Sequence, residues 1–451
     1  MRRVIIGGTN SGCGKTTVTC AVLAALKNRG LNVSAFKCGP DYIDPMFHRK
    51  VICVDSHNLD SFFFSRDTLL HLLDEYGKDS DISVIEGVMG FYDGTCGSAH
   101  SVSEMTETPA VIVIDCKGMS DSMGAVMSGF LHYRPNSIAG FIFNRLPEKL
   151  ISLAEKLCCE LETEYFGCLP KNSFTVESRH LGLVTADEIS DIQERLAGLG
   201  ELAEKYIAID KLVSITDSPL PSFEAPVIPR FQSAPAIAAA RDSAFCFIYP
   251  ENMELLEKMG CNIRYFSPLT DSKVPDADGL ILCGGYPELY ADKLSANISM
   301  TESIRSCISG GMPTIAECGG FMYLHDRLTD KKGSSYPMAG VIHGEVFPTS
   351  RLQRFGYITM KAEKDGLLCK KGKAIRAHEF HYWDSSDCGS SFTAEKSDGR
   401  AWKCCHCSDS LYAGFPHINF YSDTVIAENF VRACISYGER NGQDTKDSPC
   451  R

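Results

Sequence analysis

The sequence predicts an α/β protein of at least two domains, the first built on a doubly wound, mostly parallel sheet. Three observations support this. An apolar run is followed by a glycine-rich loop and a helical pattern at the start of the chain, later runs are nearly continuous in Val, Ile and Phe, and a proline-rich stretch separates two such series. The 451 residues, 44% of them hydrophobic, are enough for two or three cores.

The first series begins with a predicted strand over 3–8, RVIIGG, and a helix over 16–29 that ends at Gly30. Further strands are expected over the ranges 31–36, 82–87, 110–115 and 138–144. Their continuous apolar character is typical of parallel strands that are covered on both faces. We expect this series to form a first domain over residues 1–190.

Five prolines and few periodic apolar positions mark the stretch from about 216 to 235 as an interdomain linker. We therefore assign 191–240 to a helical segment with this linker, and 241–451 to a second α/β domain. Strands of the second domain are expected over 245–250, 278–285 and 312–320.

Composition excludes some classes of partner. The net charge of −12 gives no overall positive field, so neither nucleic acid nor an anionic membrane is an expected partner. No apolar run approaches the ~20 residues of a membrane span, and the run after the first three residues is too short for a signal peptide. The 21 cysteines are an odd number scattered through apolar segments, which indicates mostly reduced, buried thiols in a cytoplasmic protein.

The stretch GGTNSGCGKTT, residues 7–17, lies between a predicted strand and a predicted helix, as a phosphate-binding loop does. Glycines let backbone N–H groups turn toward phosphate oxygens, and the helix N-terminus adds partial positive charge. Lys15 would reach the β- and γ-phosphates and Thr16 would bind Mg²⁺. The standard pattern is missed by one position, because a threonine stands where its first glycine belongs. The predicted nucleotide-binding residues here are Gly8, Thr9, Asn10, Ser11, Gly12, Cys13, Gly14, Lys15, Thr16 and Thr17.

Two acidic stretches follow strands of the same domain. VIEGVMGFYDG (84–94) places Glu86 at a strand end and Asp93 in the loop beyond it, and FKCGPDYIDP (36–45) places Lys37, Asp41 and Asp44 in a proline-bounded turn. Ligands of doubly wound sheets bind at this carboxyl edge. Glu86 could hold Mg²⁺ through water; ordinary solvated loop acids are the alternative interpretation.

Together with VIDCKGMSDS and SRHLGL, these stretches resemble the cobyrinate a,c-diamide synthase family, whose ATP-binding domain is similar to dethiobiotin synthetase. The resemblance covers most of the chain, and the GPDYIDP segment favours this family over the related cobyric acid synthases. It implies that Mg-ATP converts the a- and c-acetate carboxylates of cobyrinic acid, an anionic tetrapyrrole, into acyl phosphates. Lys15 and Lys37 would neutralise charge during this transfer.

The same resemblance implies roles at the substrate end. Asp41, Tyr42 and Asp44 are expected to bind the substrate, and Asp93 is expected to take part in catalysis. The expected metal ligands are Thr16, Asp41 and Glu86.

Two further segments carry weaker indications. Asn144, in IFNR, resembles the adenine-contacting Asn of the dethiobiotin synthetase group, and a strand-end capping Asn is the alternative. Arg179 and His180, in SRHLGL, could meet an anionic macrocycle or pair with local acids.

The second domain carries a predicted nucleophile. MPTIAECGGFMYLHDRL is typical of a strand, a sharp turn and a helix, with Cys318 at the turn, where the helix N-terminus favours the thiolate. Backbone N–H groups near Gly319 and in CGGYPE, at Gly284 and Gly285, are candidates for an oxyanion hole.

The base we choose is His417 in GFPHINF, with His378 and His381 of RAHEFHYW as competitors. With Cys318, this arrangement resembles the class I glutamine amidotransferases, in which Cys attacks the side-chain amide of L-glutamine and releases ammonia. Members commonly show His-x-Glu, but here the third position is Asn419. Either this Asn orients the imidazole or the site works as a Cys–His dyad.

Several alternatives stay open. The same chemistry could act on nickel sirohydrochlorin or hydrogenobyrinic acid, because the motifs are expected to recognise carboxylates of the macrocycle and not its central metal. From another class, the chain could be a P-loop ATPase with a non-catalytic amidase-like docking domain, which the presence of both Cys318 and His417 disfavours. The resemblance suggests a homodimer.

In WKCCHC (402–407), soft metal ligands occur without the usual two-residue gaps, which favours structural cysteines of a strand.

Overall fold

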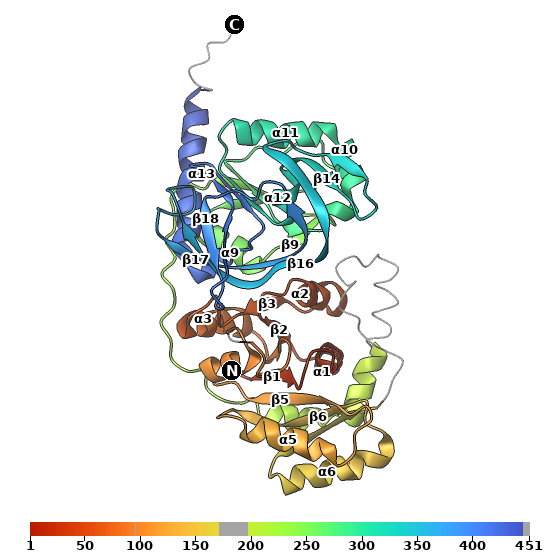
Figure 1. The fold of residues 1–451 in the computed structure, drawn as a ribbon. Helices are drawn as coiled ribbons and strands as arrows, with labels where there is room; N and C mark the ends of the chain where they lie inside the picture. The colour runs from red at the N-terminus through yellow and green to blue at the C-terminus, as the bar shows by residue number, and fades with distance from the viewer. Residues whose placement is uncertain (95, 171–196, 445–451) are drawn as a thin grey trace. The chain divides into compact units, whose positions relative to one another are not determined.

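The computed structural model describes residues 1–94, 96–170 and 197–444. They belong to two compact units, Met1–Pro226 and Val227–Arg451, each with its own α/β core (Figure 1). The predicted fold class is confirmed. Arg179, His180 and the predicted boundary at residue 190 lie outside the described residues. No helix in the described ranges is long and apolar enough to cross a membrane.

The first unit contains a seven-stranded sheet in the order β3-β2-β4-β1-β5-β6-β7, in which every neighbouring pair is parallel. Its central strands are fully buried, as their apolar runs predict. One prediction is displaced: the strand expected over 31–36 lies at Val33–Cys38, so Lys37 lies inside the sheet and not in a turn. The strands are β1 Arg3–Gly8, β2 Val33–Cys38, β3 Ser56–Leu59, β4 Ile82–Glu86, β5 Ala110–Asp115, β6 Ile138–Asn144 and β7 Glu164–Leu169.

Helices cover both faces of this sheet. The chain leaves β1 toward β2 but leaves β4 in the opposite direction toward β5, so right-handed crossovers place α1 and α4 on opposite faces. The crevice between the carboxyl ends of β1 and β4 is therefore the topological switch point. Figure 1 shows α5 and α6 side by side. The helices are α1 Lys15–Asn28, α2 Ile43–Phe47, a π-helix at His48–Ile52, α3 Arg66–Gly77, α4 Ala99–Thr106, α5 Ser122–His132, α6 Ile151–Glu160, a helix over 197–206 and α8 Ile209–Ser214.

The second unit has a six-stranded sheet in the order β10-β8-β11-β13-β21-β20, parallel except for β20. Its first strand in the chain, β8, begins at Ala236, within the range expected for the linker, because the alanine-rich run AIAAA is a weak strand signal. The strand expected over 245–250 stops at Phe247 and pairs with β12 outside the main sheet. The strands named here are β8 Ala236–Ala240, β9 Phe245–Phe247, β10 Asn262–Phe266, β11 Gly279–Leu282, β12 Gly284–Gly285, β13 Thr314–Glu317, β20 His406–Cys407 and β21 Leu411–Gly414.

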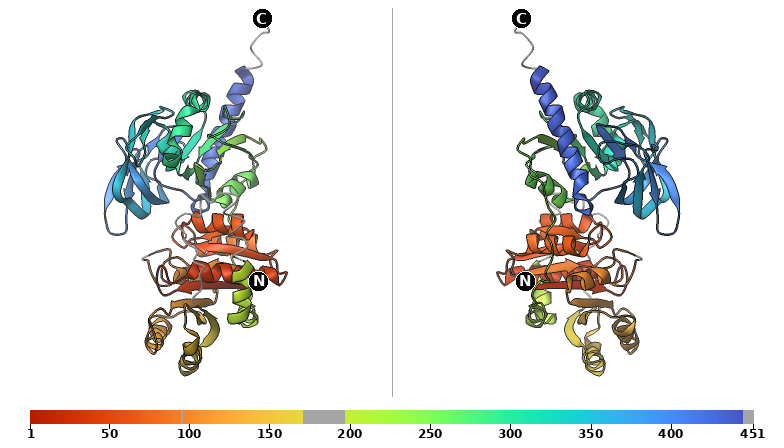
Figure 2. Two further views of the ribbon diagram at one scale, coloured as in Figure 1. Left: turned by 90° about the vertical axis from the view of Figure 1, so that its right-hand side faces the viewer. Right: turned by 90° about the vertical axis from the view of Figure 1, so that its left-hand side faces the viewer.

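A further sheet of this unit, β15-β14-β16-β18-β19 with β17 on β16, was not anticipated. Figure 2 shows its long β16–β17 hairpin on one side of the unit and α13 on the other. The stretch 402–407, expected to be one strand, is split between β19 and β20 in two different sheets. The elements are β14 His325–Thr329, β15 Ser335–Pro337, β16 Ile342–Ala362, β17 Ala374–Ser385, β18 Phe392–Glu395, β19 Ala401–Cys404, α9 Pro250–Lys258, α10 Ala291–Ala296, α11 Ile298–Ser309, α12 Gly319–Tyr323 and α13 Thr424–Asp444.

Candidate active sites

The glycine-rich loop joins β1 to α1 at the switch point of the first sheet. Gly12 and Gly14 have φ angles of 80° and 98°, in the left-handed region that glycine tolerates best. Gly8 is needed for a different reason: a Cβ there would lie 2.4 Å from the sulfur of Cys13 and 2.7 Å from Cγ of Lys15. This close packing gives a physical reason for a glycine one position before the place that the standard pattern assigns.

The loop lysine and threonine lie at the start of α1. The Lys15 ammonium donates a hydrogen bond to the carbonyl of Asn10 at 3.1 Å, inside the loop, and burial lowers its pKa. The Thr16 hydroxyl donates to Oε1 of Glu86 at 2.6 Å. A hydroxyl beside a carboxylate is a donor set that suits Mg²⁺, so these residues fit the ion that the sequence implies.

A buried ionic cluster lies beside the loop. The Lys37 ammonium is 2.5 Å from Asp44, 3.0 Å from Glu86 and 3.9 Å from Asp41. Burial opposes the charge of Lys37, but these carboxylates raise its pKa well above the usual value. Burial and the neighbouring carboxylates raise the pKa of Asp44, whereas Lys37 and His48 outweigh burial and lower that of Glu86. One lysine thus balances several acids, and Asp44 and Glu86 are buried rather than solvated loop acids.

The other predicted residues of the first unit are spread around this cluster. Asp41 accepts hydrogen bonds from the backbone of Ile43 and Asp44 at 2.8 and 3.2 Å, which fixes the start of α2. The exposed Asp93 accepts one from the backbone of Gly90 at 2.8 Å. Ser11 is exposed in the loop, while Tyr42 and Thr17 are buried.

Asn144, at the end of β6, lies under the glycine-rich loop. Its side-chain amide donates to the carbonyl of Cys13 at 2.9 Å, and a Cβ on Gly14 would lie 2.0 Å from the same amide nitrogen. The contact is thus with the loop backbone.

In the second unit, three neighbouring strands supply one site. Cys318 follows β13 directly, the glycines of CGGYPE follow β11, and His417 follows β21. Cys318 has φ 46° and ψ −101°, a strained conformation at the first residue before α12, and its side chain is 5% exposed. A sharp strand-to-helix turn of this kind presents a nucleophile at the edge of a sheet.

His417 contacts the last residue of β13 and the turn residue that follows it. Its Nδ1 lies 3.5 Å from Oε2 of Glu317, and it also interacts with the Cys318 thiol. Burial alone would lower the pKa of His417, but Cys318 and Glu317 raise it to about 10. A charged imidazole next to a thiol favours the thiolate, which is the nucleophilic form.

The glycines predicted for the oxyanion hole lie against this pair. A Cβ on Gly284 would be 2.5 Å from Cε1 of His417, and one on Gly319 would be 3.0 Å from the backbone nitrogen of Gly285. A Cβ on Gly284 would force the imidazole to move, and one on Gly319 would be unusually tight. The backbone nitrogen of Gly285 thus lies beside the residue that follows Cys318, as an oxyanion hole requires.

The competing histidines lie on β17. His378 pairs with His417 through backbone hydrogen bonds of 3.1 and 2.9 Å, and burial lowers the pKa of its ring to about 3. The ring of His381 stacks on Phe415 at 3.8 Å. Since the interactions with Cys318 belong to His417, the geometry favours His417 as the base.

In comparisons with known proteins, a different family model matches each of the two units. A model described as CobQ/CobB/MinD/ParA nucleotide binding domain matches residues 4–183, and one described as CobB/CobQ-like glutamine amidotransferase domain matches residues 236–425. The cobyrinate a,c-diamide synthase of Listeria monocytogenes serotype 4b (strain F2365) is 38% identical over 451 residues, covering 96% of this chain and 99% of the relative. That of Thermoplasma volcanium is 38% identical over 454 residues, covering 97% and 98%. The chain belongs to the cobyrinate a,c-diamide synthase family.

As a member of the cobyrinate a,c-diamide synthase family, the chain is an amidating ligase of cobalamin biosynthesis, with a nucleotide-binding domain and a glutamine amidotransferase domain. The resemblance seen in the sequence motifs is confirmed.

Sequence reasoning missed two residues of these sites. His48 is fully buried, with Nε2 3.3 Å from Glu86 and Nδ1 3.1 Å from the hydroxyl of Ser56. Glu317 was passed over although it directly precedes Cys318. Each contact joins different strands or helices, so the available signal was only a polar residue in an otherwise apolar segment.

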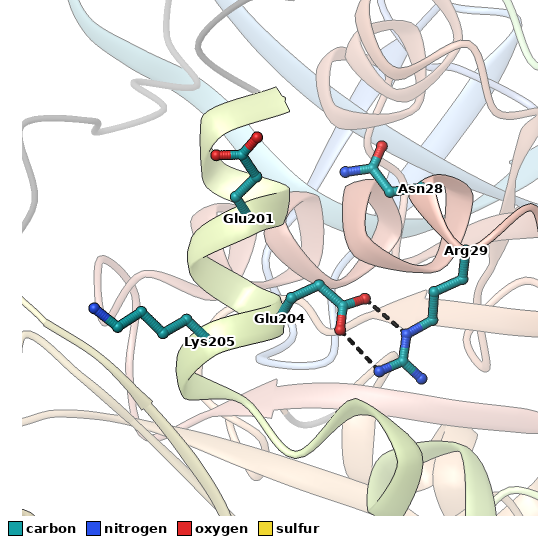
Figure 3. A pocket seen from close by; sticks show the side chains of 5 residues that line it. All are labelled: Asn28, Arg29, Glu201, Glu204 and Lys205. Carbon is teal, nitrogen blue, oxygen red and sulfur yellow. Dashed lines mark hydrogen bonds and ion pairs between the residues drawn. The ribbon is translucent and has the colours of Figure 1, made fainter.

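A surface pocket of the first unit lies away from the glycine-rich loop. It is lined by Asn28, Arg29, Glu201, Glu204 and Lys205, at the opposite end of α1 from the glycine-rich loop (Figure 3). Arg29 forms hydrogen bonds of 2.7 and 2.8 Å with Glu204 there. This paired surface joins α1 to the helix over 197–206 and carries none of the predicted site residues of the family.

Proposed function

We propose that this chain amidates the a- and c-acetate carboxylates of cobyrinic acid, using ATP to form acyl phosphates and L-glutamine as the source of ammonia. The name of the relatives suggests the acceptor. The observation that carries the proposal is the Cys318–His417 pair, set against glycine backbone N–H groups, in one chain with a glycine-rich loop and two buried lysines.

In the first unit, a carboxylate oxygen of the acceptor attacks the γ-phosphorus of ATP, the bond to the β-phosphate oxygen breaks, and ADP leaves. Lys15 and Lys37 neutralise charge on the transferred group. Thr16 and Glu86, with Asp41 nearby, would hold Mg²⁺, which supplies charge neutralisation for the nucleotide. Asp93, Tyr42 and Asp44 are proposed to contact the acceptor.

In the second unit, the Cys318 thiolate attacks the amide carbon of glutamine, and the backbone at Gly284, Gly285 and Gly319 stabilises the oxyanion. His417 protonates the departing nitrogen, so the C–N bond breaks and ammonia leaves. Water then hydrolyses the thioester to glutamate. Ammonia displaces phosphate from the acyl phosphate and forms the amide.

Product mass tests the proposal. The purified protein is incubated with ATP, Mg²⁺ and glutamine and with cobyrinate, hydrogenobyrinate or nickel sirohydrochlorin, and we expect two acid-to-amide exchanges on cobyrinate. Four exchanges instead of two, at other positions of the macrocycle, would indicate a cobyric acid synthase. Preference for another acceptor would mean that this acceptor, and not cobyrinate, is the substrate. Consumption of ATP and glutamine with every acceptor unchanged would contradict the proposal. Light scattering measures the homodimer that the resemblance suggests.

A further inference from the structure

The base of a Cys–His pair needs a partner at its second ring nitrogen, because that contact fixes the tautomer and the ring orientation. Asn419, two residues after His417, cannot readily serve, since its side chain is engaged elsewhere. Its Nδ2 donates to Oε1 of Glu251 at 3.1 Å, and its Oδ1 accepts the backbone N–H of Tyr421 at 3.0 Å.

Glu317 makes the contact with the second ring nitrogen of His417 that Asn419 does not make. One carboxylate oxygen lies 3.5 Å from Nδ1 of His417, and the other accepts the backbone N–H of Ile418 at 3.0 Å. The carboxylate is buried, and its strand β13 pairs with β21 so that Glu317 lies opposite Gly414. Both oxygens therefore face the segment that carries the base.

We propose that Glu317 is the positioning residue of the glutaminase site, holding the imidazole of His417 from the position directly before the nucleophile. The inference rests on the proposed roles of Cys318 and His417. A single strand end then supplies both the nucleophile and the orienting carboxylate, and the usual carboxylate two residues after the base becomes dispensable.

The surrounding charges fit this role. The titratable groups facing His417 are Glu317 and Cys318 at the end of β13 and His378 on β17. His378 has a pKa of about 3 and is neutral near pH 7, so it adds no opposing charge there. Glu317 is thus the carboxylate that stabilises the imidazolium beside the Cys318 thiolate.

Glu317→Gln tests the inference, since it removes the charge while keeping the side-chain length and an acceptor for the N–H of Ile418. We expect kcat for glutamine hydrolysis to fall roughly 10- to 100-fold with KM little changed. The imidazolium will lose its proton more readily, so the alkaline limb of the pH profile will move to lower pH. Alkylation of Cys318 by iodoacetamide near pH 7 will slow in parallel.

Glu251→Gln is the matched control, because it removes another buried carboxylate of the same unit, one that contacts Asn419. We expect it to leave the pH profile in place. Glu317→Asp, which keeps the charge, should hold the alkaline limb closer to its original position while lowering kcat. Circular dichroism verifies that each variant is folded.

The outcomes separate this inference from the proposed function. Should Glu317→Gln retain the wild-type pH profile and alkylation rate in a protein that hydrolyses glutamine through Cys318, the inference is overturned and the function stands. A shift of the same size in Glu251→Gln also overturns it. A wild-type protein that hydrolyses no glutamine contradicts the proposed function instead.

Discussion

The two sites of this chain use the same strand-end geometry for opposite electrostatic purposes. In the first unit, Lys37 lies among three carboxylates next to a glycine-rich loop whose tip is exposed. In the second, one carboxylate, one imidazole and one thiol are enclosed in a packed core. The site proposed for a polyanion and a metal ion holds many charges in balance, whereas the site proposed to generate a nucleophile isolates a single pair.

The largest effect is expected from Cys318→Ala. Because the variant lacks the nucleophile, glutamine-dependent amidation should fall on the order of 10⁴-fold or more, while amidation supported by added ammonia persists. Cys261→Ala is the control: that thiol is buried in the same unit and its pKa is raised to about 12 by burial. If Cys318→Ala still used glutamine at the full rate, the assignment of Cys318 as the nucleophile would be wrong.

The charge balance of the first unit can be broken with Lys37→Met. Leaving Glu86 and Asp44 buried without their cation should destabilise this unit by about 3–5 kcal/mol. Both tryptophans, Trp383 and Trp402, lie in the second unit. In urea unfolding, the transition of the first unit, followed by circular dichroism, should therefore move to a lower urea concentration. The transition followed by tryptophan fluorescence, which reports on the second unit, should not move.

The pH dependence of this effect has a definite sign. Glu86 has a folded pKa below its usual 4.5, so its pairing stabilises the fold above that pH and is lost as pH falls toward the folded value. The difference between wild type and Lys37→Met should narrow when unfolding is measured at pH 4 instead of pH 7. A constant difference would show that the cation is not compensating Glu86.

The two sites also differ from their surroundings in how much of them could be predicted from the sequence: local motifs could be, and contacts between strands could not. The glycine-rich loop and the turn at Cys318 are local patterns, in which strand, turn and helix follow one another in the chain, so their fold could be predicted. The partners of His48 and Glu317 come from other strands, and only the pairing of β13 with β21 brings Glu317 to His417. The spacing rule pointed to Asn419, whose amide instead caps the turn that follows it.

The predicted boundaries of some strands were wrong for similar reasons. Strand β2 was placed too early because Lys37 and Cys38 look like the start of a turn, although buried carboxylates make a lysine tolerable inside a sheet. The 21-residue strand β16 is interrupted by Gly344, Pro348 and Gly356, which are residues that usually mark turns. Tertiary pairing with β17 overrides these local signals.

Glycine substitutions compare how tightly each site is packed. Gly284→Ala places a Cβ 2.5 Å from the His417 ring, and the resulting displacement should lower glutamine hydrolysis roughly 10- to 100-fold. At Gly12, nothing lies within 4 Å of the added Cβ, so the cost of Gly12→Ala is backbone strain of about 1–2 kcal/mol at φ 80°. Steady-state assays of each half-reaction test this, and equal losses at both sites would contradict the difference in packing.

The smallest effect is expected from Asn144→Ala, which separates two interpretations of this residue. Its amide bonds to the carbonyl of Cys13, and losing that support should weaken ATP binding by only a few-fold, in line with one neutral hydrogen bond of about 1 kcal/mol. Support of the loop backbone is indifferent to the base, so KM should rise equally for ATP and GTP. Thr16→Ala is the control, because it removes a hydroxyl proposed for the phosphate end and should also leave the ATP to GTP preference unchanged. A change in that preference in Asn144→Ala would instead show that the side chain contacts adenine, and the loop contact would then be secondary.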